Sequence, residues 1–221
     1  ISGRRSDTIM VLHMPANGNR PVLISLPRDS YVPIPGHGSD KINAAYPAVK
    51  AIAEQELLAD GAQDRREISA EAGARGRTAL IGAVEDLTGL TIDHYAEVNL
   101  VGFATLTKAI GGVTVCLAAP TRDGLSGARF GAGVQTIEGA TALAFVRQRH
   151  GLQDGDLDRI ARQQAFAAGL ADRLISTGTL ANPVRLAQLV GVVNRNVVLD
   201  DGWNVEQALT QFAGLRANDL R

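Results

Sequence analysis

The sequence contains one cysteine, four histidines and no long apolar run. Cys116 alone cannot build a disulfide or a zinc site within the chain, and its place in the apolar run 113–117 predicts a buried thiol. The histidines are scattered, and no serine or cysteine stands in a nucleophile elbow, which disfavours a hydrolase triad. Because no run reaches about 18 apolar residues, no membrane-spanning helix is predicted within the printed chain, which is expected to be soluble as given.

Net charge is also nearly absent, because 22 basic and 23 acidic residues give a formal charge of −1. The chain therefore has no broad positive field that would attract nucleic acid. Lysine is scarce, since only Lys41, Lys50 and Lys108 among the basic residues are not arginine, and this bias suggests a GC-rich genome. The 221 residues suffice to bury a core, and no repeat or low-complexity linker divides them. We expect a single domain over residues 1–221.

The apolar pattern predicts an α/β protein. Strands are expected at residues 8–13, 22–26, 95–99 and 113–117, and helices at 44–58, 78–87, 100–110, 156–176, 182–193 and 204–215. Residues 139–147 are expected to form a short helix or a helix-to-strand junction. The order strand, helix, strand between residues 95 and 117 is typical of a sheet covered by helices. The stretch 121–135 is predicted to be a loop or hairpin. The polar stretch 59–77, which includes Arg65 and Arg66, has no apolar period and is predicted to be a mobile surface excursion.

Four polar clusters stand at the ends of these elements. They are Arg4-Arg5-Ser6-Asp7-Thr8, Pro27-Arg28-Asp29-Ser30, Lys41-Ile42-Asn43, and the pair Arg147 and Arg149 with the helix that carries Asp156, Arg159 and Gln163. Spacings of three and four place the polar residues of that helix on one face. Arginine never deprotonates at neutral pH and offers a planar fork of donors, so several arginines in one place suit a phosphate or a diphosphate.

These residue types suggest phosphoryl transfer. The arginines expected to surround a diphosphate are Arg5, Arg28, Arg147, Arg149 and Arg159. Their charge would neutralise the negative charge that grows on phosphate oxygens during transfer. Asp7 would bind a divalent cation, because Mg²⁺ prefers carboxylate and phosphate oxygens and needs only one or two protein carboxylates. The alternative is that these residues form ordinary Arg–Asp pairs, which are common and individually weak.

Seven short motifs follow one another in a fixed order along the chain. They are Arg5-Ser6-Asp7-Thr8, Pro27-Arg28-Asp29-Ser30, Lys41-Ile42-Asn43-Ala44-Ala45-Tyr46, Tyr95-Ala96-Glu97-Val98-Asn99, Gly111-Gly112-Val113, Val146-Arg147-Gln148-Arg149 and Asp156-Leu157-Asp158-Arg159-Ile160-Ala161-Arg162-Gln163. Each motif alone is unspecific. Taken together, over about residues 4 to 170, they strongly resemble the LytR-CpsA-Psr family.

The resemblance implies a three-layer α/β/α fold with a central mixed sheet and an apolar tunnel for a prenyl chain. It implies an extracytoplasmic phosphotransferase, anchored in the cell membrane by a helix upstream of Ile1, that moves a glycopolymer from a polyprenyl-diphosphate carrier to peptidoglycan. The GC-rich composition together with the family analogy makes arabinogalactan from an actinobacterium the expected polymer. Pyrophosphatase activity is a further expectation that the resemblance implies.

The resemblance also assigns site residues. The implied phosphate ligands are Arg5, Arg28, Arg147, Arg149, Arg159 and Gln163, the implied ligand of Mg²⁺ or Mn²⁺ is Asp7, and the implied catalytic residues are Arg28, Arg149 and Asp7. Arg162 points off the polar face of its helix and is expected to be structural. No general base is assigned, although Asp154 and Asp156 are candidates.

Two other functions stay open at this level. A non-catalytic module that binds polyprenyl phosphate or an anionic glycan would use the same arginines without a metal. A prenyl-diphosphate hydrolase would use water in place of an acceptor sugar. Trp203 could serve as a ligand platform or as an anchor of the core.

Overall fold

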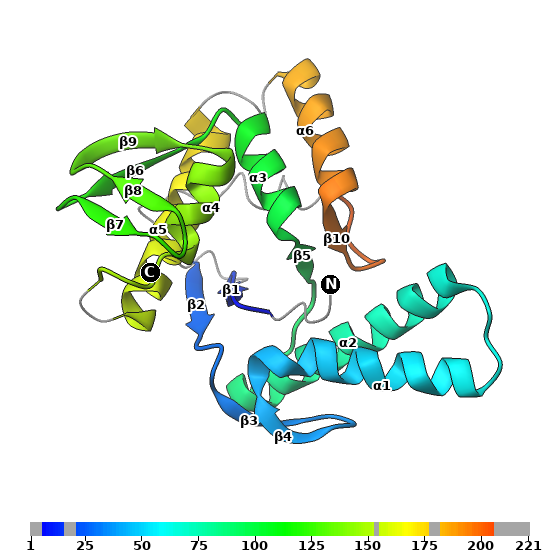
Figure 1. Ribbon diagram of the computed structural model, residues 1–221. Helices are drawn as coiled ribbons and strands as arrows, with labels where there is room; N and C mark the ends of the chain where they lie inside the picture. The colour runs from blue at the N-terminus through cyan, green and yellow to red at the C-terminus, as the bar shows by residue number, and fades with distance from the viewer. Residues whose placement is uncertain (1–5, 16–20, 153–154, 177–181, 206–221) are drawn as a thin grey trace. The chain divides into compact units, whose positions relative to one another are not determined.

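The computed structural model describes residues 6–15, 21–152, 155–176 and 182–205. The chain contains both helices and strands (Figure 1), which confirms the predicted α/β class. The chain divides into two compact units, Ile1–Val11 with Ile24–Asp93 and Leu12–Leu23 with His94–Arg221, and each is described by itself. Within the described ranges, no helix is long and apolar enough to cross a membrane.

The first unit is built on two long helices that lie side by side, α1 (Ala45–Ala59) and α2 (Arg65–Thr88) (Figure 1). The predicted surface excursion over 59–77 is therefore wrong, because residues 65–77 form the first half of α2. The buried residues of this half are mostly very small: they are Ile68, Ala72, Gly73 and Gly76. Alanine and glycine give little apolar signal in a sequence, so the helical period was hidden.

The start of α2 is fixed by its N-cap residue, Asp64. The Asp64 carboxylate accepts hydrogen bonds from the backbone N–H groups of Arg66 at 2.7 Å and Glu67 at 3.3 Å. Such a cap satisfies donors that have no partner within the helix. The helix ends at Gly89, whose φ of 68° is the left-handed conformation that glycine adopts most readily.

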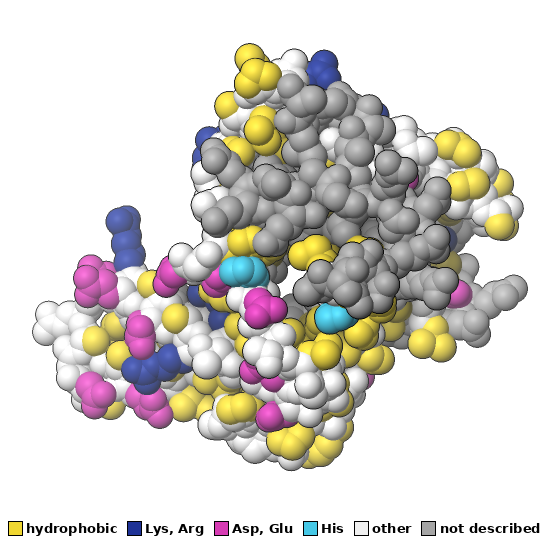
Figure 2. All heavy atoms as spheres, turned by 180° about the vertical axis from the view of Figure 1, so that it is seen from behind, with side chains coloured by type: hydrophobic (Ala, Val, Ile, Leu, Met, Phe, Trp, Pro, Cys, Tyr) yellow, Lys and Arg dark blue, Asp and Glu magenta, His cyan; other side chains and the backbone are white. Residues whose placement is uncertain are grey.

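Acidic and basic side chains lie interspersed along the α1–α2 hairpin (Figure 2). Arg75 forms ion pairs with Glu71 at 3.0 Å and with Glu56 at 3.2 Å, and Lys50 pairs with Glu54. Exposed pairs of this kind each add little stability. The hairpin is therefore held mainly by the packing of the two helices.

Short strands precede these helices along the chain. The residues of β1 (Ile9–His13) and β2 (Val22–Leu26) are divided between the two units. β3 (Tyr31–Ile34), β4 (Gly38–Lys41) and the 3₁₀ helix η1 (Ile42–Ala44) belong to the first unit. β1 pairs with β2, and β3 pairs antiparallel with β4. The unpredicted β3 alternates, with Val32 and Ile34 buried, and its inward side chains join the core. The buried core residues are Val11, Val32, Ile34, Ile42, Ala45, Ala79, Ala83 and Val84.

The second unit holds the remaining elements. Its helices are α3 (Leu100–Ala109), α4 (Gly139–Arg147), α5 (Asp156–Ser176) and α6 (Pro183–Asn196), and its strands are β5 (Ala96–Val98), β6 (Val113–Leu117), β7 (Thr121–Asp123), β8 (Ala128–Phe130), β9 (Gly133–Ile137) and β10 (Val197–Leu199). β6 pairs with β9, β7 with β8 and β5 with β10, all antiparallel. In the part of the chain that the structure describes, strands pair two by two, where a central mixed sheet was predicted. The helix predicted over 204–215 lies almost wholly outside the described residues.

The prediction that Cys116 is a buried thiol is wrong, and the burial pattern of β6 shows why. Val113, Val115 and Leu117 are buried, whereas Thr114 and Cys116 are exposed. Side chains alternate between the two faces of a strand, so an apolar run does not require that both faces are covered. Cys116 is therefore a surface thiol instead of a core residue.

Candidate functional site

The first unit brings two acids and two bases together, from the residues before β1, after β2 and at the end of β4. Arg28 Nη1 donates to Asp7 Oδ1 at 2.5 Å, and Arg28 Nε lies 3.6 Å from Asp29 Oδ2. Lys41 Nζ donates to Asp29 Oδ1 at 2.8 Å. We call these four residues the Asp7–Arg28 cluster. The Asp7 side chain is 59% exposed and the Arg28 side chain only 18%, so the carboxylate lies at the surface above the guanidinium.

Arg28 is held in place by its backbone and keeps one donor unused. The backbone N–H of Asn43 donates to Arg28 O at 3.2 Å, which ties the residue to η1. Arg28 Nε is buried and has no hydrogen-bond acceptor in the described part of the chain. A buried donor without an acceptor is costly. An anionic ligand oxygen would satisfy this donor.

The same cluster offers carboxylates to a cation. Asp7 and Asp29 both contact Arg28, so two carboxylates lie near one guanidinium. Among the residues that the structure describes, no group of three or more His, Cys, Asp or Glu side chains could hold a metal. The donor set fits Mg²⁺ or Mn²⁺ bound through one or two carboxylates, with substrate phosphate oxygens completing the shell. It does not fit a site built from protein ligands alone.

The second unit carries the arginine segment, residues 147–151, which follows α4. Gln148 lies in an extended conformation, with φ −59° and ψ 134°, and is completely buried. Its neighbours are more accessible, since Arg147 is exposed and Arg149 is half-buried. The two arginines therefore flank a buried residue, with Arg147 as the last residue of α4 and Arg149 directly after Gln148.

The Gln148 side chain anchors the arginine segment. Its Nε2 donates to Thr121 Oγ1 and, at 3.0 Å, to His150 O, while its Oε1 accepts from Arg162 Nη1 at 2.7 Å. The Arg162 guanidinium also lies 4.9 Å from the centre of the Phe145 ring. Arg162 is thus structural, as its place off the polar face of the helix predicted.

Asp123 on β7 holds the arginine segment through its backbone. Its carboxylate accepts from the N–H groups of Arg149 at 3.2 Å, His150 at 3.3 Å and Leu125 at 2.9 Å. Burial alone would raise the pKa of Asp123, but the hydrogen bonds from Arg149 and the other donors outweigh it and hold the pKa well below its ordinary value. Asp123 is therefore an anion at neutral pH. Sequence reasoning missed it, because no spacing rule links residues 123 and 149.

Two further predicted residues lie on α5. Arg159 and Gln163 are both buried, with exposed fractions of 4% and 7%. Gln163 Nε2 donates to Val146 O at 3.0 Å, which ties α5 to the last turn of α4. This bond gives Gln163 a structural task, and its role as a phosphate ligand stays a prediction.

The predicted site residues are thus distributed over both units. Asp7 and Arg28 are in contact in the first unit, whereas Arg147, Arg149, Arg159 and Gln163 all belong to the second. Arg5, Asp154 and the side chain of Asp156 lie outside the described residues.

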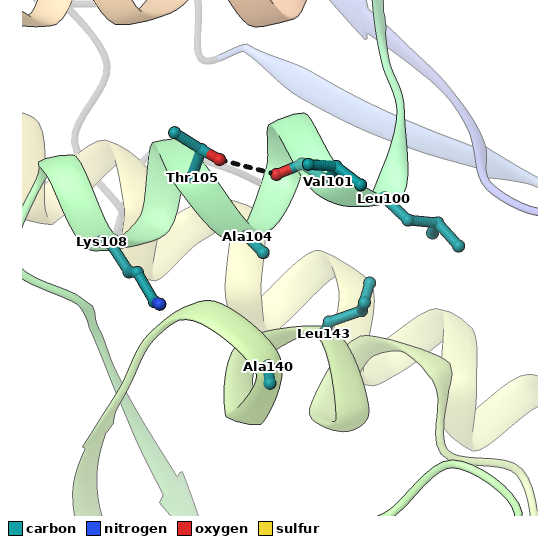
Figure 3. Close-up of a pocket in the computed structure, with 7 residues that line it drawn as sticks. All are labelled: Leu100, Val101, Ala104, Thr105, Lys108, Ala140 and Leu143. Carbon is teal, nitrogen blue, oxygen red and sulfur yellow. Dashed lines mark hydrogen bonds between the residues drawn. The ribbon is translucent and has the colours of Figure 1, made fainter.

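An apolar pocket of about 370 Å³ lies between α3 and α4 (Figure 3). Its lining residues are Leu100, Val101, Ala104, Thr105, Lys108, Ala140 and Leu143. Thr105 Oγ1 donates to Val101 O at 2.9 Å, so the hydroxyl is turned back onto its own helix. Lys108 supplies the charge in this lining. The predicted arginines and Asp7 are not among the seven residues.

A histidine–aspartate pair lies near the start of β5. His94 Nδ1 is 3.1 Å from Asp200 Oδ1, and the His94 ring stacks on Trp203 at 4.9 Å with an interplanar angle of 13°. The backbone N–H of Tyr95 donates to Asp200 Oδ2 at 3.0 Å. Burial alone would raise the pKa of Asp200, but the bonds from Tyr95 and His94 lower it below its ordinary value. This packing favours Trp203 as an anchor rather than a ligand platform.

A model of the LytR_cpsA_psr family matches residues 2–218. The chain belongs to this family. The predicted LytR-CpsA-Psr resemblance is therefore confirmed.

Relatives of this LytR-CpsA-Psr chain include cell-wall proteins. Cell wall biosynthesis protein LcpA of Corynebacterium glutamicum is 46% identical over 215 residues, which are 97% of this chain and 42% of LcpA. The polyisoprenyl-teichoic acid–peptidoglycan teichoic acid transferase TagU of Oceanobacillus iheyensis is 33% identical over 97% of this chain and 59% of TagU. The chain thus spans roughly half the length of these relatives.

A solved structure shares the fold. The crystal structure of Bacillus subtilis TagV matches with a TM-score of 0.72 and 24% sequence identity, covering 99% of this chain and 76% of TagV. At this level of identity the likeness concerns the fold alone.

Proposed function

We propose that this LytR-CpsA-Psr chain is a phosphotransferase that moves a glycopolymer from a polyprenyl-diphosphate carrier to peptidoglycan. The observation that carries the proposal is the arginine segment, in which Arg147 and Arg149 flank a buried and fully engaged Gln148. A preorganised pair of arginines suits phosphate oxygens, because no reorganisation is needed when charge develops. The relationship to TagU, which is named as a peptidoglycan transferase, supports the same reaction class.

The proposed chemistry is a displacement at phosphorus. A hydroxyl oxygen of peptidoglycan attacks the phosphorus nearer the glycan and forms a new P–O bond. The bond from that phosphorus to the bridging oxygen breaks, and polyprenyl phosphate leaves with the electron pair. The hydroxyl proton passes to the leaving phosphate or to solvent. Arg147 and Arg149 would stabilise the negative charge that grows on the phosphate oxygens.

The Asp7–Arg28 cluster supplies the proposed cation ligand. Asp7 would bind Mg²⁺ or Mn²⁺, with Asp29 as the second nearby carboxylate. A bound cation would neutralise phosphate oxygens and so lower the barrier to attack. Arg28 would donate its buried Nε–H to a phosphate oxygen, because that donor has no acceptor among the described residues. The Arg28 guanidinium and the cation would then act on the same diphosphate.

The lipid and the polymer complete the proposal. An apolar tunnel would take the prenyl chain, whose transfer from water is favourable by roughly 25 cal/mol per Å² of apolar area. We propose arabinogalactan as the polymer, because the lysine-poor composition suggests a GC-rich genome and LcpA comes from Corynebacterium glutamicum. We also propose that the protein acts on the outer face of the cytoplasmic membrane, because its proposed acceptor is peptidoglycan.

The test is transfer from a synthetic prenyl-diphosphate glycan to a peptidoglycan fragment, with Mg²⁺ or with EDTA. We expect Arg28→Ala and Arg149→Ala each to lower turnover by about 10²- to 10³-fold, which is the usual effect of removing one group that stabilises transition-state charge. Arg75→Ala is the matched control, since Arg75 forms exposed ion pairs on the α1–α2 hairpin. Wild-type turnover in both site variants would defeat the proposal.

Two other outcomes would assign the alternatives. Phosphate release at the same rate with and without the peptidoglycan fragment would indicate a hydrolase. Tight binding of the diphosphate with no turnover in either metal condition would indicate a binding module.

A further inference from the structure

We propose that Asp123 is a positioning residue that aligns Arg149 with its phosphate ligand, so that the β7–β8 hairpin is part of the working site. The inference rests on the proposed function of the arginine segment. Asp123 would not touch the substrate. It would act through the backbone of the residue that does.

The two carboxylate oxygens of Asp123 hold two different pieces of chain. Oδ1 accepts from the N–H of Leu125 at 2.9 Å and thereby fixes the turn after β7. Oδ2 accepts from the N–H groups of Arg149 at 3.2 Å and His150 at 3.3 Å. The side chain is only 2% exposed, so water does not compete for these bonds. Asp123 therefore clamps the arginine segment to the hairpin.

Thr121 adds a second attachment on the same face of β7. Residues two apart in a strand point to the same side, and Thr121 and Asp123 are both buried. Thr121 Oγ1 accepts a hydrogen bond from Nε2 of Gln148, and Gln148 directly precedes Arg149. The segment is thus bound to β7 through one side chain and two backbone N–H groups.

Gly151 shows how closely the segment follows the strand. A Cβ at this position would lie 2.7 Å from Arg122 O, and the φ of Gly151 is +74°. Glycine is therefore required both by the backbone conformation and by the approach to β7. Residues 148 to 151 together contact β7 at Thr121, Arg122 and Asp123, which sets the register of the whole segment.

A carboxylate is needed for this arrangement. The backbone N–H groups of Leu125, Arg149 and His150 all donate to Asp123, and a carboxylate can accept on both oxygens. The His150 ring nitrogen Nδ1 also lies 3.7 Å from Asp123 Oδ1. In Asp123→Asn the side chain keeps its size but presents an NH₂ group to one of the two sets of donors. Either the hairpin turn or the arginine segment would lose its acceptor. The backbone of Arg149 would shift, and a misplacement of about 1 Å can cost about 10²-fold in rate.

The experiment compares Asp123→Asn, Arg149→Ala and the double variant in the full chain. The assay measures kcat and KM for transfer from the prenyl-diphosphate glycan, and circular dichroism confirms that each variant is folded. We expect Asp123→Asn to lower kcat by about 10²-fold with a small change in KM, because alignment acts in the transition state. The matched control is Asp86→Asn, which makes the same substitution at an exposed site on α2 and should leave kcat unchanged.

The double variant separates positioning from general damage. If Asp123 works through Arg149, the double variant will fall no more than about threefold below Arg149→Ala, because coupled residues are non-additive. Independent effects that multiply, or wild-type kcat in Asp123→Asn, would overturn the inference. If Asp123→Asn does not fold, Thr121→Val takes its place, because it removes the hydrogen-bond acceptor of Gln148 Nε2 and leaves Asp123 intact. The effects of Thr121→Val and Arg149→Ala on kcat should then be coupled in the same way. Absence of this coupling counts against the inference.

A failure of the inference can be told from a failure of the proposed function. An active wild type with a fully active Asp123→Asn variant leaves the transferase standing and removes the role of Asp123. An inactive wild type defeats the transferase, and the same variants are then compared by calorimetric binding of a short-chain prenyl diphosphate. Coupled losses of affinity in that measurement would support the inference, and additive losses would overturn it.

Discussion

Gly76 tests the close packing of α1 against α2, the part of the fold that was least expected. Gly76 is buried in α2. A Cβ at this position would lie 2.7 Å from Tyr46 O, 3.1 Å from Tyr46 Cδ2 and 3.3 Å from Lys50 Cβ. The nearest of these atoms belongs to the backbone of α1 and cannot rotate away. Gly76→Ala must therefore shift one helix relative to the other.

Two opposing effects set the magnitude, and a nearby glycine separates them. Alanine is about 1 kcal/mol better than glycine in a helix interior, while overpacking a well-packed contact costs about 1–3 kcal/mol. Gly73 is buried one turn earlier in α2, and a Cβ there would meet Tyr46 Oη at 3.5 Å and Arg77 Nη1 at 3.6 Å, which are ordinary contacts. Gly73→Ala should therefore gain the higher helix propensity of alanine without overpacking the contact between the two helices. The two alanine variants should therefore differ by about 1–3 kcal/mol in the free energy of unfolding.

Urea denaturation followed by the helical circular dichroism signal measures this difference. Gly73→Ala is expected at or above the midpoint of the wild type, and Gly76→Ala is expected below Gly73→Ala with an unchanged denaturant slope. Equal midpoints for the two variants would refute the close approach of α1 and α2 at Gly76.

Two further predictions concern carboxylates that hold local structure. Asp64→Ala should lower the free energy of unfolding by about 1 kcal/mol in urea denaturation, because the N-cap of α2 is lost. Asp64→Asn should stay near the wild type, because asparagine also caps helices. An alanine variant as stable as the asparagine variant would contradict the role of Asp64 as the cap. Because the pKa of Asp200 is lower in the folded chain, its contribution to stability is present above about pH 3.9, the ordinary value for aspartate, and is lost as the pH falls through the folded pKa. The stability difference between wild type and Asp200→Asn should therefore shrink as urea titrations move from neutral to acidic pH, and a difference that stays constant would argue against the depressed pKa.

Several helices could be predicted closely because their ends carry strong local signals. The structure has α3 at Leu100–Ala109 and α5 at Asp156–Ser176, against predictions of 100–110 and 156–176. Of the two alternatives for residues 139–147, the structure has the helix, α4 at Gly139–Arg147. Asn99 caps α3 by accepting from the N–H of Gly102 at 2.8 Å, and two glycines follow the helix. The first half of α2 could not be found in the same way, because its cap stands before small residues instead of an apolar stripe.

Some residues of the site could likewise be predicted from the sequence, and others could not. Arg28 and Asp7 lie in motifs that a resemblance can identify, and the structure places them in direct contact. Asp123 has no such signature, because it acts on the backbone N–H of Arg149, and any residue except proline offers that group. Contacts to the backbone across 26 residues of sequence depend on the fold alone.

Arginine content by itself therefore does not identify a phosphate site. Arg162 is engaged by Gln148 and the ring of Phe145, and Arg173 donates to Ile110 O at 3.2 Å and Gly111 O at 3.0 Å, beyond the end of α3. Acceptors of the protein itself use these two guanidinium groups. Arg28 differs, because its buried Nε lacks a hydrogen-bond acceptor within the described ranges although two carboxylates lie beside it. An arginine whose donors exceed its local acceptors is the one that a diphosphate can complete, and this criterion can be read only from a folded chain.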